Sequence, residues 1–342
     1  MLSERQQMIL RMVIEDYVHS AEPVGSRTIS KHSEVAFSPA TIRNEMADLE
    51  EMGYLEQPHT SAGRIPSHKG YRFYVDHLMN PFSLSSEELF QIKKVFVEKI
   101  DAMERVVQHT AQILSSLTNY TSLVLGPQVH ENKLKHIQLV PLSEHTAVAI
   151  IVTDTGHVEN KKVSVPEGIS TDEISKFVAI LNDKMTGVPL NLVKTKLYHE
   201  IMGELNRYMD QFEGVMNLLN QIVQPEKDDR VYLGGTAKIL NQPEFRDVEK
   251  LRPLLDILET NQTVIHLLNQ QNTPGIQVRI GLENQLEQLK NCSIITATYH
   301  IDGNVAGTIG VLGPTRMEYG RVISVLDYLT ETMSELLTRL HK

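Results

Sequence analysis

The stretch from residue 38 to residue 72 constrains the fold of this chain most, because it carries a helix start signal and a helical apolar repeat. Ser38 is a residue type that caps a helix, and Pro39 suits the first helical position, where no backbone N–H is needed. An apolar stripe at spacings of four and three residues follows, made of Ile42, Met46 and Leu49. The stretch therefore predicts an amphipathic helix over residues 38–52.

The residues after this helix predict a small hairpin. Gly53 ends the helix, Tyr54 and the two residues after it can start a strand, and a loop rich in proline, glycine and basic residues leads to a second strand. Upstream, an apolar repeat predicts a helix over residues 4–19. A break at residues 22–25 and a cap at Ser26 predict a second, short helix over 26–33. Three helices with tight turns and then a hairpin are the layout of a winged helix-turn-helix module, whose third helix enters the major groove of DNA.

The third helix has a slim face opposite its apolar stripe. At about 100° per residue, Ala40, Asn44 and Ala47 point away from the stripe, and Thr41 and Arg43 lie on its flanks. Asn can pair with adenine and Arg with guanine, and each such contact discriminates between bases by about 1–3 kcal/mol. Taken alone, the Arg and the Asn are more often ordinary solvated helix residues. Within a helix-turn-helix module we predict that they contact bases.

Positive charge is local in this chain. The formal net charge is −10, and residues 1–80 hold eight Lys and Arg against eleven Asp and Glu, whereas a DNA-binding domain is usually basic. Residues 59–72, however, contain three cations and two histidines and no acid, and there we expect contacts with phosphate or the minor groove. The complete set of predicted DNA contacts is Arg27, Ser38, Ala40, Thr41, Arg43, Asn44, His59, Arg64, His68 and Lys69.

The rest of the chain predicts one α+β sheet domain that an insertion divides. A long helix over residues 86–118 follows a linker, and the apolar period then switches to two, with three strands in residues 134–165. Helical segments come next, and strands return before a last helix over 315–340. The predicted helical segments are 171–186, 197–224 and 236–270, and the returning strands are 276–280, 293–299 and 305–312.

Four segments resemble the HrcA family of heat-inducible transcription repressors. They are AEPVGSRTIS at residues 21–30, SPATIRNEMADLEEMGYLEQPHTSAGRIPSHKGYRFYVDHLM at 38–79, YLGG at 232–235 and GTIGVLGPTRMEYGRVISVLDYL at 307–329. The resemblance implies a winged helix-turn-helix domain at 1–80 and a GAF-like domain at 86–166 and 231–342. It also implies an inserted, mostly helical dimerisation domain at 167–230, whose end could lie as late as residue 275.

The resemblance also implies a function. It implies a sequence-specific repressor that binds double-stranded DNA as a homodimer, at an inverted-repeat operator upstream of chaperonin and chaperone operons. It further implies that the GroEL chaperonin keeps the repressor in its active, folded form. None of this follows from periodicity or spacing.

The sequence gives little support to other classes of function. No apolar run reaches the ~20 residues that span a bilayer, and the N-terminus lacks a signal-peptide pattern, so we expect a cytoplasmic protein. Cys292 is the single cysteine, the scattered histidines match no metal motif, and no G-x-S-x-G elbow occurs. We therefore expect that this protein is not an enzyme and binds no metal or cofactor. Gly234 and Gly235 are expected to form a strand-to-helix turn rather than a phosphate-binding loop.

Two alternatives remain open from the sequence. One is a metabolite-responsive winged-helix regulator with an effector pocket in the GAF-like domain, which a metabolite that stabilises the protein and shifts its operator affinity would favour. The other is an enzyme that uses the N-terminal module only for protein contacts. It would need a catalytic constellation, and the sequence offers none.

Overall fold

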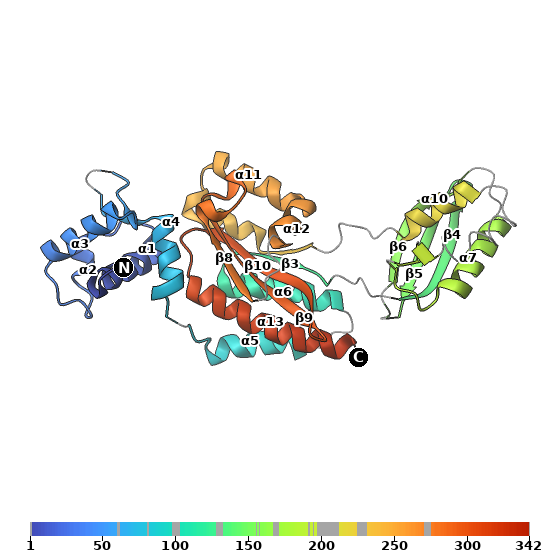
Figure 1. Ribbon diagram of the computed structural model, residues 1–342, viewed down its shortest axis with the longest axis horizontal. Helices are drawn as coiled ribbons and strands as arrows, with labels where there is room; N and C mark the ends of the chain where they lie inside the picture. The colour runs from blue at the N-terminus through green and yellow to red at the C-terminus, as the bar shows by residue number, and fades with distance from the viewer. Residues whose placement is uncertain are drawn as a thin grey trace. The chain divides into compact units, whose positions relative to one another are not determined.

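The computed structural model describes residues 2–59, 62–80, 82–97, 103–127, 133–154, 156, 158–166, 171–190, 192–193, 195–196, 212–223, 231–269 and 275–341. The chain divides into two compact units (Figure 1). The first unit combines Met1–Pro127 with Arg230–Lys342, and the second consists of Gln128–Asp229. The second unit is therefore an insertion into the first.

The N-terminal part of the first unit contains short helices and a two-stranded hairpin. Its elements are α1 (Glu4–Ser20), α2 (Ser26–Ile29), α3 (Pro39–Glu51), β1 (Leu55–Glu56), β2 (Ile65–Pro66), α4 (His68–Phe73) and the π-helical turn η1 (Tyr74–Leu78). A capping box between Ser3 and Gln6 starts α1. The order of elements follows the sequence prediction, although α2 ends at Ile29 rather than at residue 33.

A five-stranded antiparallel sheet forms the centre of the first unit, in the order β7-β3-β10-β9-β8. Its strands are β3 (Thr121–Leu125), β7 (Val231–Gly234), β8 (Ile276–Ile280), β9 (Cys292–Ile301) and β10 (Asn304–Pro314). Side chains alternate across the sheet, so that Leu123 and Leu125 belong to one apolar core and Val124 to another.

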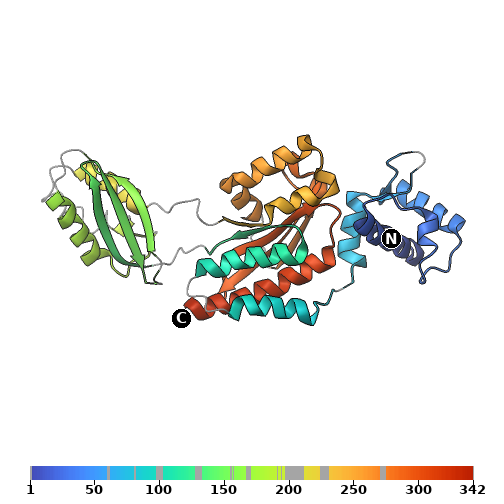
Figure 2. The ribbon, with the colours of Figure 1, turned by 180° about the vertical axis from the view of Figure 1, so that it is seen from behind.

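Helices cover both faces of this sheet, as Figures 1 and 2 show. α6 (Met103–Thr118) and α13 (Tyr319–His341) pack on one face, with α5 (Ser86–Val97) beside α6. α11 (Val248–Glu259) and α12 (Asn261–Asn269) pack on the other face. Four short 3-10 helices complete the unit: η2 (Thr236–Asn241), η3 (Pro243–Phe245), η4 (Gly281–Glu283) and η5 (Glu287–Leu289).

The second unit contains a three-stranded antiparallel sheet and two described helices. The strands β4 (Leu134–Ser143), β5 (Thr146–Thr153) and β6 (Val158–Ser164) pair in chain order, and α7 (Thr171–Met185) and α10 (Phe212–Val223) pack against β4 and β6. Along β5 the side chains that face the helices are buried, for example Ala149 and Ile151. The alternate side chains on the opposite face are only half-buried, for example Val148 and Ile150.

The predicted start of the insertion, residue 167, is wrong. The three strands in residues 134–165 were expected to join the C-terminal strands in one sheet, but they form a separate sheet and belong to the unit that starts at Gln128. An apolar period of two identifies a strand, whereas its pairing partner depends on contacts far apart in the sequence. The unit ends at Asp229, next to the predicted residue 230.

Other predicted elements also need adjustment. The helix predicted over 86–118 is present as α5 and α6, with residues 98–102 outside the described part, and the buried strand β3 was not predicted. The segment 236–270 holds two 3-10 helices before α11 and α12. Of the helix predicted over 197–224, residues 212–223 are present as α10, and residues 197–211 lie outside the described part. The three C-terminal strands and the helix after them are present as predicted.

Candidate nucleic-acid interface

α3 forms where the sequence places its start signal. The Ser38 hydroxyl accepts a hydrogen bond from the Thr41 N–H over 3.2 Å, and Pro39 occupies the first helical turn. The side chains of Ile42, Met46 and Leu49 are buried in the core shared with α1. This packing fixes the rotation of α3 about its axis, and so determines which side chains point outward.

The outward face of α3 is open to solvent. Ala40, Arg43, Asn44 and Ala47 are all exposed. Neither Arg43 nor Asn44 has a side-chain hydrogen bond or ion pair with the described residues. Thr41 is half-buried, and its Oγ1 lies 2.9 Å from the Ser38 Oγ, so these two hydroxyls bind each other at the start of the helix.

Two further cations lie on α2 and in the turn that follows it. Arg27 and Lys31 are exposed, and neither side chain forms a hydrogen bond or ion pair with residues 2–59 and 62–80. α2 packs directly against α3. Other arginines of the same region are neutralised, because Arg5 pairs with Glu45 over 3.0 Å and Arg11 pairs with Glu34 over 2.7 Å. Lys31 is absent from the sequence-predicted set, although it lies within the helix predicted over residues 26–33, four positions after Arg27, and this spacing could have included it.

The hairpin after α3 is bound to the segment that precedes α2. Its strands pair Leu55 with Pro66 and Glu56 with Ile65. Arg64 and Val24, just before α2, exchange two backbone hydrogen bonds of 2.9 and 2.8 Å. A Cβ atom on Gly63 would lie 2.4 Å from the Val24 carbonyl oxygen, so this close approach requires a glycine.

The predicted phosphate contacts of the hairpin have different surroundings. Arg64 donates a hydrogen bond from Nε to the Glu50 carboxylate over 2.7 Å, and its side chain is only 19% exposed. Lys69 is exposed, but its Nζ donates to the Met52 carbonyl over 2.8 Å and lies 4.4 Å from the centre of the Tyr54 ring. His59 is exposed at the hairpin, next to residues 60–61, which lie outside the described residues.

His68 is not brought together with α3. It starts α4, and its imidazole lies against Gly281 and accepts a hydrogen bond at Nδ1 from the Leu282 N–H over 3.4 Å. Of the predicted set, the structure therefore gathers Arg27, Ser38, Ala40, Thr41, Arg43 and Asn44 on the α2–α3 face. It gives Arg64, His68 and Lys69 partners within the chain.

The aromatic cluster after the hairpin packs inside the protein. Tyr71 is 1% exposed and lies 5.9 Å from Tyr319, measured between ring centres. Burial raises the pKa of the Tyr71 hydroxyl well above its ordinary value. Phe73 packs against Tyr54 at 5.4 Å. An aromatic core, rather than a base-stacking platform, is the role that these contacts give to the cluster.

The glycine pair of the YLGG segment also has a packing role. β7 ends at Gly234 and η2 begins at Thr236, as the sequence predicts. A Cβ on Gly234 would lie 2.4 Å from the Ala111 carbonyl oxygen, and one on Gly235 would lie 1.9 Å from the Ser115 Oγ. α6 therefore packs directly against this turn.

In the described part of the chain, no three His, Cys, Asp or Glu side chains are grouped to hold a metal ion. No helix built from described residues has both the length and the apolar character needed to cross a membrane.

Comparisons with known proteins identify the family. A family model described as the HrcA protein C terminal domain matches residues 104–323. The heat-inducible transcription repressor HrcA of Brevibacillus brevis is 56% identical over 338 residues, which cover 99% of this chain and 98% of that protein. The protein of the same name from Bacillus pumilus is 48% identical over 342 residues, covering 100% and 99%. A crystal structure of a hypothetical protein is similar with a TM-score of 0.65 and 25% sequence identity, covering 99% of this chain and 98% of that one. The chain therefore belongs to the HrcA family of heat-inducible transcription repressors.

Proposed function

We propose that this protein represses heat-shock genes by binding an inverted-repeat operator as a homodimer, with α3 of each protomer in the major groove of one half-site. The observation that carries the proposal is the open face of α3, where Arg43 and Asn44 are exposed and have no partner among the described residues. Arg27 and Lys31 add unpaired positive charge beside it, in a chain whose formal net charge is −10. Such a face offers base contacts and local attraction to phosphate.

Each group on this face has a separate role in the proposal. Arg43 reads guanine and Asn44 reads adenine, and the small side chains of Ala40 and Ala47 let the helix enter the groove. Arg27 and Lys31 bind phosphates, which fixes the register of the helix on the duplex. Arg64 and Lys69 position the hairpin through their contacts with Glu50 and Met52. Occupation of promoter DNA then blocks transcription sterically.

Variants of the α3 face test this division of roles. An operator is first selected from random DNA with the wild-type protein, and affinities are then measured at fixed salt. Arg43→Ala should lose about 1–3 kcal/mol at its preferred base and relax the preference there. Arg339→Ala is the matched control, because it removes one positive charge from an arginine 77% exposed on α13. Equal effects of the two variants on sequence preference would contradict the base-reading role of Arg43.

The three-stranded sheet of the second unit supports the homodimer part of the proposal. Its outer face carries Val148, Ile150 and Val152. Val140, which pairs with Val148, and Val158, which pairs with Val152, are 38% and 54% exposed. A face of this apolar character fits a second copy of the same sheet. Ile150→Lys should therefore shift the mass measured by light scattering from dimer to monomer. Ala179→Lys, at an exposed position of α7, adds the same charge elsewhere and should leave the dimer intact.

Heat control through a chaperonin completes the proposal and rests on the family resemblance. A cytoplasmic repressor that needs GroEL to stay folded is released from DNA when unfolded proteins occupy that chaperonin. Purified chaperonin should therefore raise the fraction of protein that binds operator after a heat pulse. An unchanged fraction would contradict this part of the proposal and leave operator binding itself unaffected.

A further inference from the structure

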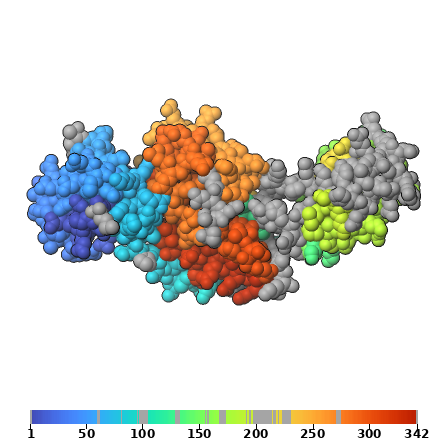
Figure 3. Space-filling view, in the orientation of Figure 1, coloured from blue at the N-terminus to red at the C-terminus, as the bar shows by residue number. Residues whose placement is uncertain are grey.

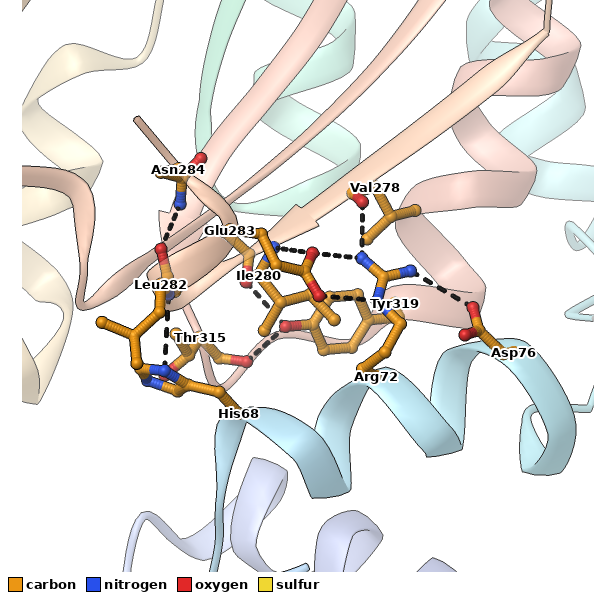
Figure 4. A network of polar contacts seen from close by, with 12 residues as sticks. His68, Arg72, Asp76, Val278, Ile280, Leu282, Glu283, Asn284, Thr315 and Tyr319 are labelled. Carbon is orange, nitrogen blue, oxygen red and sulfur yellow. Dashed lines mark hydrogen bonds and ion pairs between the residues drawn. The ribbon is translucent and has the colours of Figure 1, made fainter. Parts of the chain in front are cut away.

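We propose that Arg72 is a positioning residue for operator binding: it locks the DNA-reading region onto the five-stranded sheet and so restricts the half-site spacing that the dimer accepts. The inference rests on the proposed function, because it concerns how the α3 face is held rather than what it reads. Its basis is a set of contacts between α4 and the β8–η4 segment, more than 200 positions later in the sequence (Figure 4).

The Arg72 guanidinium contacts three groups at once. Its Nε and one terminal nitrogen grip both carboxylate oxygens of Glu283, the first over 2.8 Å. The same terminal nitrogen donates to the Val278 carbonyl of β8 over 2.6 Å, and the other terminal nitrogen donates to Asp76 over 3.2 Å. β8 is an edge strand of the sheet, so Arg72 satisfies a carbonyl that no neighbouring strand would bind. A planar guanidinium that holds a carboxylate by two bonds resists rotation as well as separation.

Glu283 is itself held in place for this contact. Its Oε2 accepts a hydrogen bond from the Ile280 N–H over 2.9 Å, within the tight turn of η4. This bond holds the carboxylate in the orientation in which it meets Arg72. Although the Glu283 side chain is exposed, the contact therefore joins α4 to the turn that follows β8.

A close approach of backbone and ring lies beside this ion pair. A Cβ atom on Gly281 would lie 2.6 Å from the His68 ring. The glycine also has φ of +54°, a conformation that side chains with a Cβ rarely adopt. His68 thereby seats the start of α4 against the same turn that Arg72 grips one helical turn later. In the space-filling view the light-blue surface around α4 adjoins the orange surface that contains β8 (Figure 3).

A second arginine joins the same two regions in the opposite direction, from the sheet side to the N-terminal helices. Arg316, between β10 and α13, donates to the Val18 carbonyl at the end of α1 over 2.6 Å and to Glu244 over 2.6 Å. Between the two arginines, Tyr71 of α4 packs on Tyr319 of α13. The apolar core is continuous across this line and includes residues of α1, α3, α4 and α13. Contacts at separate points prevent the N-terminal region from tilting or sliding against the five-stranded sheet, which a single linker could not do.

The consequence for DNA binding follows from the two-fold symmetry of a dimer. Half-sites of an inverted repeat must match the separation of the two recognition helices, and a change of spacing also rotates one half-site about the duplex axis. Each joint that is locked narrows the range of spacings that one dimer can fit. Without the Arg72 contact, the DNA-reading region of each protomer can take more orientations than the rest of the dimer alone allows. The variant should therefore tolerate more spacings and lose part of the advantage of binding both half-sites together.

The test compares full-length wild-type protein with Arg72→Lys and Glu283→Gln. Lysine keeps the charge but cannot reproduce the fork of bonds, and the glutamine variant removes a negative charge. DNA targets are the selected operator, the same operator with its spacer changed by about two base pairs, roughly one fifth of a helical turn, and a single half-site. Glu287→Gln is the matched control, because it removes an exposed carboxylate that pairs with Lys290 in the next turn.

We expect both junction variants to bind the single half-site as the wild type does. On the full operator they should lose about tenfold in affinity, and their ratio of affinities between native and altered spacing should fall toward one. Bulk electrostatics predicts the opposite sign for Glu283→Gln, since a less negative protein binds DNA more tightly. The control variant should keep the wild-type ratio.

Three results would overturn the proposal. The first is that both junction variants keep the wild-type ratio of affinities between native and altered spacing. The second is a wild-type protein that binds all spacings equally, since no joint then restricts spacing. The third is an equal loss on the half-site, which would mean that Arg72 acts through the folding of α3. Failure of the proposed function is distinguishable from all three, because the wild type would then bind operator and scrambled DNA alike.

Discussion

Arg64 Nε lies 2.7 Å from the Glu50 carboxylate, and this contact joins the hairpin to the last turn of α3. We expect Arg64→Ala to weaken operator binding by displacing the hairpin, and to leave the salt dependence of binding nearly unchanged. Arg27→Ala should instead reduce the slope of log affinity against log salt by about one, because it removes a phosphate contact. Titrations at several salt concentrations measure both slopes. The reverse pattern would assign the phosphate contact to Arg64.

The close approach at Gly63 predicts a specific sensitivity to substitution. In Gly63→Ala the new methyl group would meet the Val24 backbone carbonyl at 2.4 Å, so the hairpin has to move away from the start of α2. We expect a loss of about 1–3 kcal/mol in the free energy of unfolding, measured by denaturant titration.

Gly25→Ala is the matched control for this substitution. Gly25 directly follows Val24, and a Cβ there would meet nothing within 4 Å. Its φ of −95° is also accessible to alanine. Equal losses in the two variants would show that the close approach at Gly63 contributes nothing.

The Arg72–Glu283 pair predicts a pH dependence of stability. Burial raises the pKa of Glu283, but the hydrogen bonds from Arg72 and the Ile280 N–H outweigh this effect and leave the pKa below its ordinary value. The folded-state pKa therefore lies below the unfolded one. The contribution of the pair is fully present above the unfolded value of about 4.3 and is lost as the pH falls through the folded pKa.

Unfolding experiments between about pH 5 and pH 3 check this dependence. Stability should fall with a shallower slope in Glu283→Gln than in the wild type, because the variant has no carboxylate to protonate at the junction. Glu287→Gln, which removes an exposed carboxylate, should follow the wild-type curve. A Glu283→Gln curve parallel to the wild type would contradict the assignment.

Cys292 predicts a chemical probe of the sheet. It is the one cysteine of the sequence and is 1% exposed at the start of β9, and burial raises the pKa of its thiol to about 12. A thiol reagent at neutral pH should therefore react with the native protein about a thousandfold or more slower than with the unfolded chain. The change in absorbance of a chromogenic thiol reagent measures both rates, with Cys292→Ser as the blank. A native rate near the unfolded rate would show that β9 opens readily.

Local signals in the sequence predict the reading helix well. The cap at Ser38 and the stripe of Ile42, Met46 and Leu49 identify both the start of α3 and its outward face, because capping and amphipathic packing depend on neighbours along the chain. The strand β3 escapes prediction, because Thr121–Leu125 is buried on both faces and lacks the alternation of a half-exposed strand.

Partners far apart in the sequence limit the prediction of the site. No spacing rule links Arg72 to Glu283 or Arg64 to Glu50, so the basic segment 59–72 looks available for phosphate while two of its three cations are held by carboxylates. The same limit explains the misplaced start of the insertion, since strands β4–β6 pair with one another rather than with β8–β10. Pairing is a property of the folded chain, and alternation within one strand does not reveal it.

The measurement that tests the central claim most directly is a titration of the wild-type protein on its selected inverted-repeat operator and on a scrambled duplex of the same length, at the same salt concentration. An exposed α3 face that reads bases predicts an affinity at least about a thousandfold higher for the operator. Equal affinities for the two duplexes would contradict the claim that this protein is a sequence-specific repressor.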